Sequence, residues 1–561
     1  MTLRTFKISA IMFALLLTTS SFVYYTRSNP YVRPEPYFYL LSIAAGVVFL
    51  QIINLKEKSS LAFFVIFLEV LLVSLSFILT QQALYKTVMG RDPWGHMVLT
   101  RQIIELGHIP DPADAWVYSV YTRMPEFHIL NAFIMLVEGI NYKWASQLVG
   151  IGILLSLTLL IGALVSQVFK LPQLVLLSIL FTATADNVLN MSGKNIVPNA
   201  LGVVLVLLAL YILLIILPKA PNKALFLLAL TIFSLVFMHS VSYGFLLIEL
   251  SIFVVLLLVA DRKERKIACI IGGILITSIV LAFLEWGIWD VYYLKQAVLL
   301  LKWLFLGVGV GRYKHEVSTV PLYLIILARL GMIIYLAIAG LSILWEVLHS
   351  SKARTRMPYY KLAFTLESMF FVGIALPITF FWAGIAHRFW YYGEILGSVF
   401  VGLVFLKLGK LGVKYNYIGK IIGVSVISVL LFLMFTASIA NDDNPLVPQY
   451  TVRTGWYDSE VSGALFSVSH RFHPLSDFDF YINNKYVAIC TYERLPDFVY
   501  KKPSIMAVRP FVILHRYFFW RNRGYIPIHK NCISKMSLEF SFIYSSGGVI
   551  MYACSPCDSI C

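Results

Sequence analysis

Long apolar runs, separated by short polar segments, recur along most of this 561-residue chain. A helix that spans a bilayer needs about 20 mostly apolar residues, and many of these runs approach or exceed that length. The pattern therefore predicts an all-α polytopic membrane domain with thirteen membrane-spanning helices. The expected spans are 8–25, 37–53, 61–80, 144–167, 172–185, 196–217, 224–237, 243–260, 267–286, 321–346, 362–383, 393–409 and 418–440.

Charged loops between the expected spans give the array an orientation. With a cytoplasmic N-terminus, every short basic loop falls on the cytoplasmic side, as the positive-inside rule requires. These loops are 56–58, 219–223, 261–266, 352–356 and 407–420. The same alternation places 81–143, 186–195, 287–320, 384–392 and the tail after about 441 outside. We therefore expect a multi-pass protein of the cell membrane with an extracytoplasmic C-terminal region.

Composition supports this class and excludes others. A mean hydropathy of +0.80 with 59% hydrophobic and 13% charged residues excludes an ordinary soluble protein. The net charge of +16 is explained by the basic cytoplasmic loops, so it does not indicate nucleic-acid binding. The first apolar run lacks a small-residue cleavage site and a second run follows closely, so we expect a retained helix instead of a signal peptide.

The pattern changes after Ala440. Residues 441–561 alternate short apolar clusters with Pro, Asn, Asp and Lys, which predicts a small extracytoplasmic domain of β-rich or α/β type. The clusters 486–489 and 511–514 are expected strands. Five of the six cysteines lie in this region, where disulfides are favoured over a thiolate metal site: Cys490, Cys532, Cys554, Cys557 and Cys561. The predicted division is a membrane domain over 1–440 and an external domain over 441–561.

The long external loop 81–143 contains the most informative polar residues. Within it, 101–109 predicts a short helix closed by Gly107. Residues 126–138 are too few to cross a bilayer, and we expect them to form a helix lying in the membrane interface. Asp92 and His96 are four residues apart, so they would share one face of a short helix. A carboxylate in that position could serve as a general base at a membrane face.

Three motifs in this loop resemble the first external loop of the C-type glycosyltransferases. This superfamily (GT-C) includes the protein O-mannosyltransferases, the aminoarabinose transferases and the oligosaccharyltransferases. The motifs are Gly90-x-Asp92-x-x-x-His96, Ile103-x-x-x-Gly107-x-Ile109-Pro110 and Met124-Pro125-x-x-His128. The similarity continues to about residue 410, through Lys194-Asn195-Ile196-Val197-Pro198 and His387-Arg388-Phe389-x-x-Tyr392.

The resemblance implies transfer of a sugar from a polyprenyl-phosphate donor to a protein or glycolipid acceptor at the extracytoplasmic face. Asp92 takes the position of the base by motif, with His96 beside it. Arg388 is the expected ligand of the donor phosphate, because a guanidinium binds phosphate in a bidentate manner. The possible further phosphate ligands are Lys194, Lys314 and His315.

The resemblance also raises the question of a metal. Oligosaccharyltransferases hold a divalent ion with acids of the first two external loops, and Asp92 and Asp186 stand at corresponding places. Their oxygen ligands would suit Mg²⁺ or Mn²⁺. Asp186 is followed by Asn187 and Val188, however, so the paired-acid motif is missing. We therefore favour a metal-free mechanism. The Trp-Trp-Asp-Tyr-Gly motif is absent too, which disfavours Asn-linked transfer.

Each assignment has an alternative that the sequence leaves open. Asp92 could cap a helix before Pro93, and His96 could pack in an aromatic cluster with Trp94. Arg388 could be an interfacial side chain that extends its charge to water. At the level of function, a transporter or flippase of lipid-linked or polar substrates is the main alternative. No internal repeat is visible and the polar residues cluster in external loops, so the transferase is favoured.

Overall fold

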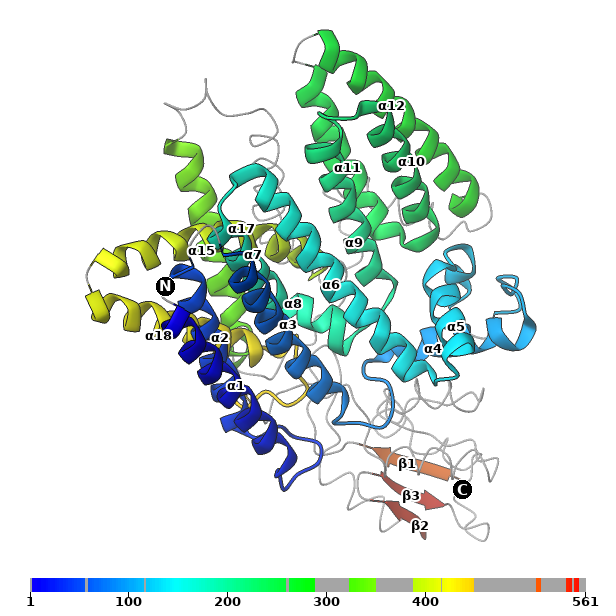
Figure 1. Cartoon of the computed structure of the whole chain (residues 1–561). Helices are drawn as coiled ribbons and strands as arrows, with labels where there is room; N and C mark the ends of the chain where they lie inside the picture. The colour runs from blue at the N-terminus through cyan, green and yellow to red at the C-terminus, as the bar shows by residue number, and fades with distance from the viewer. Residues whose placement is uncertain are drawn as a thin grey trace.

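The chain is mainly helical in the computed structural model (Figure 1). The described residues are 3–55, 59–115, 118–258, 262–287, 322–349, 387–414, 416–447, 511–515, 541–546 and 549–553. The helices of the first half are α1 (Leu3–Tyr25), α2 (Glu35–Ile53), α3 (Ser60–Gln82), α4 (Arg91–Leu106), η1 (Ser119–Arg123), α5 (Glu126–Glu138), α6 (Tyr142–Phe169), α7 (Pro172–Thr184), α8 (Asp186–Leu189), η2 (Asn190–Lys194), α9 (Pro198–Tyr211) and η3 (Ile212–Ile216). Those that follow are α10 (Pro221–Met238), α11 (Ser240–Leu258), α12 (Arg262–Ala282), η4 (Phe283–Gly287), α14 (Leu322–Leu327), α15 (Leu330–His349), α17 (His387–Lys414) and α18 (Asn416–Phe435).

Eight of these helices are long and apolar enough to cross a membrane, among the residues described. They coincide with eight of the expected spans. The expected span 172–185 corresponds to a bent pair, α7 followed by α8 and η2, with an angle of 56°. Three more expected spans fall on shorter apolar helices: Ser240–Val255, Leu330–Glu346 and Ile421–Phe435. The span 362–383 lies outside the described residues. The protein is therefore a multi-pass membrane protein, while the count of thirteen stays a prediction.

Local sequence explains where several helices begin and end. Proline stands in the first turn of α7, α9 and α10, where its missing N–H has no helical partner to lose. Gly107 and Gly139 follow α4 and α5 in the left-handed conformation, which glycine adopts without a steric penalty. These residues confine α4 and α5 to lengths too short for a span.

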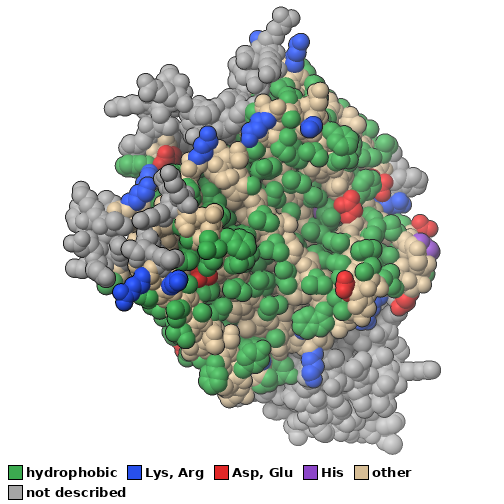
Figure 2. Space-filling view, in the orientation of Figure 1, with side chains coloured by type: hydrophobic (Ala, Val, Ile, Leu, Met, Phe, Trp, Pro, Cys, Tyr) green, Lys and Arg blue, Asp and Glu red, His purple; other side chains and the backbone are tan. Residues whose placement is uncertain are grey.

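The helices pack into two connected groups. In the first, α2 lies between α1 and α18, and α7 packs against α6 and α17. In the second, α9 packs against α10 and α11, and α12 covers both of these (Figure 1). Figure 2 shows apolar side chains over much of the surface, which is typical of helices that face lipid. Helix α6 contacts both α7 and α9 and so joins the two groups.

The predicted interfacial helix is confirmed as a helix with the expected bounds, Glu126–Glu138. Its buried face consists of Phe127, His128, Asn131 and Ala132. Its other face is apolar and exposed: Ile129, Leu130, Phe133, Leu136 and Val137. The predicted helix 101–109 is the end of a longer helix, because α4 begins at Arg91 and ends at Leu106.

Three short strands form an antiparallel sheet in the C-terminal region. They are β1 (Phe511–His515), β2 (Ser541–Ser546) and β3 (Val549–Ala553), in the order β1-β3-β2. The apolar cluster 511–514 is thus a strand, as the sequence predicts. The cluster 486–489 and the five cysteines of this region lie outside the described residues. The external domain over 441–561 stays a prediction.

Candidate functional site

Asp92 lies in the first turn of α4 and is exposed. The preceding Gly90 has a φ of 85°, so the chain enters the helix through a conformation that favours glycine. A carboxylate in the first turn stabilises the helix dipole, which fits the capping role that the sequence left open. The hydroxyl of Tyr118 donates to Asp92 Oδ1 at 3.2 Å. The carboxylate is therefore both accessible and held by a neighbour.

Tyr118 owes its position to an unusual backbone conformation and to a glycine. Its φ of 53° lies in the left-handed region, which is uncommon for an aromatic residue. The ring lies against α4 at Gly95, where a Cβ would come within 2.1 Å of Tyr118 Cε2. Such strain persists only where surrounding contacts enforce it, and it concentrates at functional sites. The sequence analysis did not identify Tyr118.

His96 is buried one turn after Asp92 and contacts another imidazole. Its Nδ1 lies 2.9 Å from Nε2 of His128, on the buried face of α5. The His96 ring also packs against Tyr118, Tyr121 and Phe127. The aromatic environment expected for His96 therefore exists, with these rings around it. Burial lowers the pKa of His96 well below its usual value, and His128 and His239 lower it further. Burial lowers the pKa of His128 to about 3.

Both imidazoles are consequently neutral at pH 7, and this predicts an acid-sensitive fold. An unfolded histidine has a pKa of about 6.5, so below that pH the unfolded chain binds protons that the folded pair excludes. The stabilisation is present above about pH 6.5 and is lost as the pH falls toward the folded pKa, at up to about 1.4 kcal/mol per pH unit for each group. Thermal unfolding of the detergent-solubilised protein at pH 7.5 and 5.5 measures the loss.

The matched variants for this measurement come from the same loop. A His96→Gln/His128→Gln protein should show a smaller fall in unfolding temperature than the wild type between the two pH values. His108 is exposed, so His108→Gln should leave the fall unchanged. An equal fall in the double variant and the wild type would contradict a contribution from the buried pair.

Asp186 is buried, and its segment is helical instead of the expected solvated loop 186–195. Asn187 organises the site: its Nδ2 donates to Asp186 Oδ1 at 3.2 Å and to Glu394 Oε1 at 2.6 Å. The backbone N–H of Asn187 donates to Glu394 Oε2 at 3.2 Å. Glu394, on α17, was missed by the sequence analysis. The sequence feature that could have indicated a role for Glu394 is its position just inside the expected span 393–409, where a charge is costly.

The structure describes some of the other expected phosphate ligands and leaves others outside the described residues. The segment 384–392 was expected to be a loop, but α17 begins within it at His387. Arg388 thus lies in the first turn of α17, and the structure describes the helix there but not the side chain. Lys314 and His315 lie outside the described residues.

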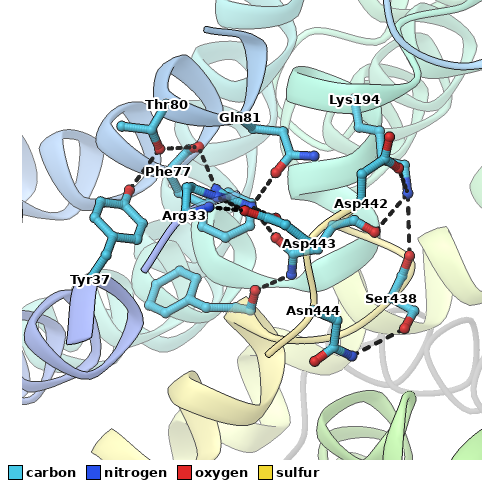
Figure 3. Close-up of polar contacts among 12 residues, drawn as sticks. Arg33, Tyr37, Phe77, Thr80, Gln81, Lys194, Ser438, Asp442, Asp443 and Asn444 are labelled. Carbon is cyan, nitrogen blue, oxygen red and sulfur yellow. Dashed lines mark hydrogen bonds and ion pairs between the residues drawn. The ribbon is translucent and has the colours of Figure 1, made fainter. Parts of the chain in front are cut away.

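Lys194 contacts the segment that follows α18 (Figure 3). Its Nζ lies 3.0 Å from Asp442 Oδ1 and donates to the carbonyl oxygens of Asn441, at 3.0 Å, and Ser438, at 3.3 Å. The lysine and the aspartate are both buried. In this structure Lys194 therefore fastens residues 438–442 to the membrane domain. Its predicted role at a donor phosphate stays a prediction.

A second ion pair, which the sequence analysis missed, binds the same segment. Arg33 is fully buried, and its Nη2 and Nε donate to the two carboxylate oxygens of Asp443 at 2.7 and 3.0 Å (Figure 3). Its backbone N–H donates to the same carboxylate at 2.7 Å. The guanidinium also donates to the side chains of Gln81 and Asn441 and to the carbonyl of Phe77. Two buried cations, Lys194 and Arg33, thus bind the turn of chain at 438–443.

The start of α4 adjoins this region. A Cβ on Gly90 would lie 3.1 Å from Oδ1 of Asn195, the residue after Lys194. The loop that carries Asp92 and the segment that carries Lys194 are therefore neighbours.

The expected metal ligands do not assemble into a metal centre in the described part of the chain. Asp92 is exposed at the start of α4, whereas Asp186 is buried beside Asn187 and Glu394. Among the described residues, no three His, Cys, Asp or Glu side chains are grouped as metal ligands would be. We therefore derive no chemical step through a metal.

Comparison with known proteins identifies the fold. No protein-family model and no curated protein matches the sequence. The oligosaccharyltransferase AglB of Archaeoglobus fulgidus, solved with an inhibitory peptide and a dolichol-phosphate, matches with a TM-score of 0.53 at 13% identity, over 88% of this chain and 74% of AglB. The same enzyme, solved with Zn and sulfate, matches with a TM-score of 0.51 at 12% identity, over 87% and 72%. The chain has the C-type glycosyltransferase fold.

The predicted resemblance to this superfamily is thereby confirmed at the level of the fold. The aminoarabinose transferase ArnT of Cupriavidus metallidurans, solved with undecaprenyl phosphate, is also similar, with a TM-score of 0.49 at 10% identity, over 90% of this chain and 99% of ArnT. In this chain α4 and α5 belong to the segment between α3 and α6, and that segment carries Asp92.

Proposed function

We propose that this protein is a membrane glycosyltransferase that moves a sugar from a polyprenyl-phosphate donor to a protein or glycolipid acceptor at the extracytoplasmic face. The observation that carries the proposal is an exposed carboxylate, Asp92, in the long loop between α3 and α6 of a C-type fold, next to the segment that ends at Asn195. AglB, which shares the fold, was solved with a dolichol-phosphate and a peptide. The shared fold supports a transferase over the transporter or flippase alternative.

In the proposed reaction Asp92 is the general base. Tyr118 donates to Oδ1, and we assign Oδ2 to the acceptor hydroxyl. The acceptor oxygen gives its proton to Asp92 and forms a bond to the anomeric carbon of the sugar. The bond from that carbon to the phosphate oxygen breaks, and the phosphate leaves on its lipid with both bonding electrons.

The leaving phosphate needs a positive environment. Arg388 lies in α17, two residues into its described part, and a guanidinium binds phosphate in a bidentate manner. We assign it as the main phosphate ligand, with Lys314 and His315 as further candidates. The ion pair of Lys194 with Asp442 makes Lys194 a support of the adjoining segment in this scheme.

Replacing Asp92 by asparagine tests the proposal. A general base contributes about 10²- to 10⁴-fold to rate, so Asp92→Asn should lower kcat by that factor. The assay incubates purified protein with labelled polyprenyl-phosphate sugars and candidate acceptors, and measures transferred label. Asp111 is an exposed acid of the same loop, and Asp111→Asn should keep wild-type turnover. Full turnover in Asp92→Asn would remove Asp92 as the base.

A further inference from the structure

A buried pair of imidazoles joins the helix that carries Asp92 to the amphipathic helix α5. His96, on α4, and His128, on α5, face each other with ring nitrogens 2.9 Å apart. We infer that His128 is a positioning residue: it donates from Nε2 to His96 Nδ1, fixes His96 as the neutral Nε2–H tautomer, and sets the position of Asp92 through α4. The effect of His128 on catalysis rests on the proposed function, whereas the assignment of the His96 tautomer does not depend on it.

The direction of the hydrogen bond follows from the other nitrogen of His128. A contact between two neutral imidazole nitrogens contains one proton, so one ring donates and the other accepts. His128 Nδ1 is buried, and no hydrogen-bond partner for it lies among the described residues. A proton there would be a buried donor without an acceptor, which folded proteins rarely tolerate. The proton of His128 therefore belongs on Nε2, and His96 accepts it at Nδ1.

The environment keeps both rings neutral. His96 and His128 are buried among Tyr118, Tyr121 and Phe127, and the two tyrosines of this set are neutral near pH 7. His239 acts on His96 from the break between α10 and α11, and it disfavours a second proton on His96. His96 consequently presents an uncharged N–H donor at Nε2.

The position of His96 is coupled to that of Asp92 in two ways, through the backbone of α4 and through Tyr118. The residues are one turn apart on α4, so they share one face of the helix. Tyr118 touches both, because its ring packs on His96 and its hydroxyl donates to Asp92. Helix α5 therefore reaches the carboxylate through the polar bond from His128 to His96, beside the packing of Phe127 on the His96 ring. The exposed apolar face of α5, centred on Phe133, is the surface through which a bilayer would hold that helix.

A spectroscopic measurement tests the tautomer without any need for activity. The full-length protein, labelled with ¹⁵N-histidine and placed in lipid nanodiscs, should show His96 with Nδ1 unprotonated and Nε2 protonated, unchanged from pH 7.5 to 5.5. His96→Gln and His128→Gln assign the two rings by loss of their signals. A proton on His96 Nδ1, or a charged His96 at pH 6.5, overturns the inference and leaves the proposed transferase standing.

Activity then tests the positioning role. Glutamine places an amide N–H close to where the histidine Nε2–H lies, whereas leucine fills the space without a donor. His128→Leu should lower kcat by about 10- to 100-fold with little change in KM for the donor, and His128→Gln should recover most of it. Asn131→Leu, one turn along the same buried face, removes an amide that in the described part of the chain donates within α5, to Phe127 O, and should keep kcat. Equal kcat in His128→Leu and the wild type, or equal loss in His128→Leu and His128→Gln, overturns the positioning role.

Discussion

Replacing Arg33 by methionine should lower the free energy of unfolding by about 3–5 kcal/mol, because the Asp443 carboxylate would remain buried without its cation. The guanidinium and the carboxylate are both almost fully enclosed, and two side-chain bonds connect them. Removing the cation also leaves the side-chain oxygens of Gln81 and Asn441 without this donor. Unfolding of the purified protein by heat or by increasing SDS in mixed micelles measures the effect.

Two further variants separate the buried charge from the loss of a side chain. In Arg33→Met/Asp443→Leu neither charge is buried, so most of the lost stability should return. Glu346→Gln breaks the exposed pair with Lys407, whose side chains are 40% and 57% accessible, and should cost under about 1 kcal/mol. If Arg33→Met were no more harmful than Glu346→Gln, the pair with Asp443 would not stabilise the fold.

The second large effect is expected at Gly150, where two segments of backbone meet. A Cβ on Gly150 would lie 2.2 Å from the carbonyl oxygen of Ser192 and 2.8 Å from Ile196 Cδ1. The first of these atoms belongs to the backbone of η2, so Gly150→Ala must push η2 away from α6. Overpacking of this kind costs typically about 1–3 kcal/mol and more where backbone must shift. The yield of folded protein and its unfolding temperature should both fall.

Gly152 provides a control on the same helix. A Cβ at Gly152 meets nothing within 4 Å, so Gly152→Ala should be neutral or should stabilise α6 by up to about 1 kcal/mol through helix propensity. Since η2 ends at Lys194, Gly150→Ala should also weaken the contact with Asp442. Equal stability of the two alanine variants would contradict the close approach of η2 to α6.

Hydropathy predicted the spans well because every helix that crosses a bilayer must be apolar over a length of about 20 residues. Helix α5 was predicted with its bounds for a related reason: its apolar run is amphipathic and stops at Gly139. Helix α4 was expected as two separate pieces, a short helix with Asp92 and His96 on one face and a second helix over 101–109, and the structure joins them into one helix, Arg91–Leu106. Pro93 stands in its opening turn, and Gly95 accommodates the ring of Tyr118.

The candidate site was less predictable, because its polar residues find partners far along the chain. Asp186 and Asn187 were expected in an external loop, but both are buried, and Asn187 donates to Glu394, 207 residues later in the chain. Lys194 was expected as a possible phosphate ligand, and in the structure its partner is Asp442. Asp92 and His96 were located by local motif and spacing. Their neighbours His128 and Tyr118 come from other parts of the loop, and only the fold shows how they are oriented.

The pair of Arg33 with Asp443 also constrains the order in which the protein can be assembled. The arginine is synthesised 410 residues before its partner, so it waits in the membrane region while nearly all of the helices are inserted. Until α18 is in place, this guanidinium requires water or lipid phosphate, and the space among α2, α3 and α18 cannot close around it. The turn that follows α18 thus completes the packing around the loop between α1 and α2. A chain that ended before Asp443 would leave the guanidinium of Arg33 without its carboxylate partner.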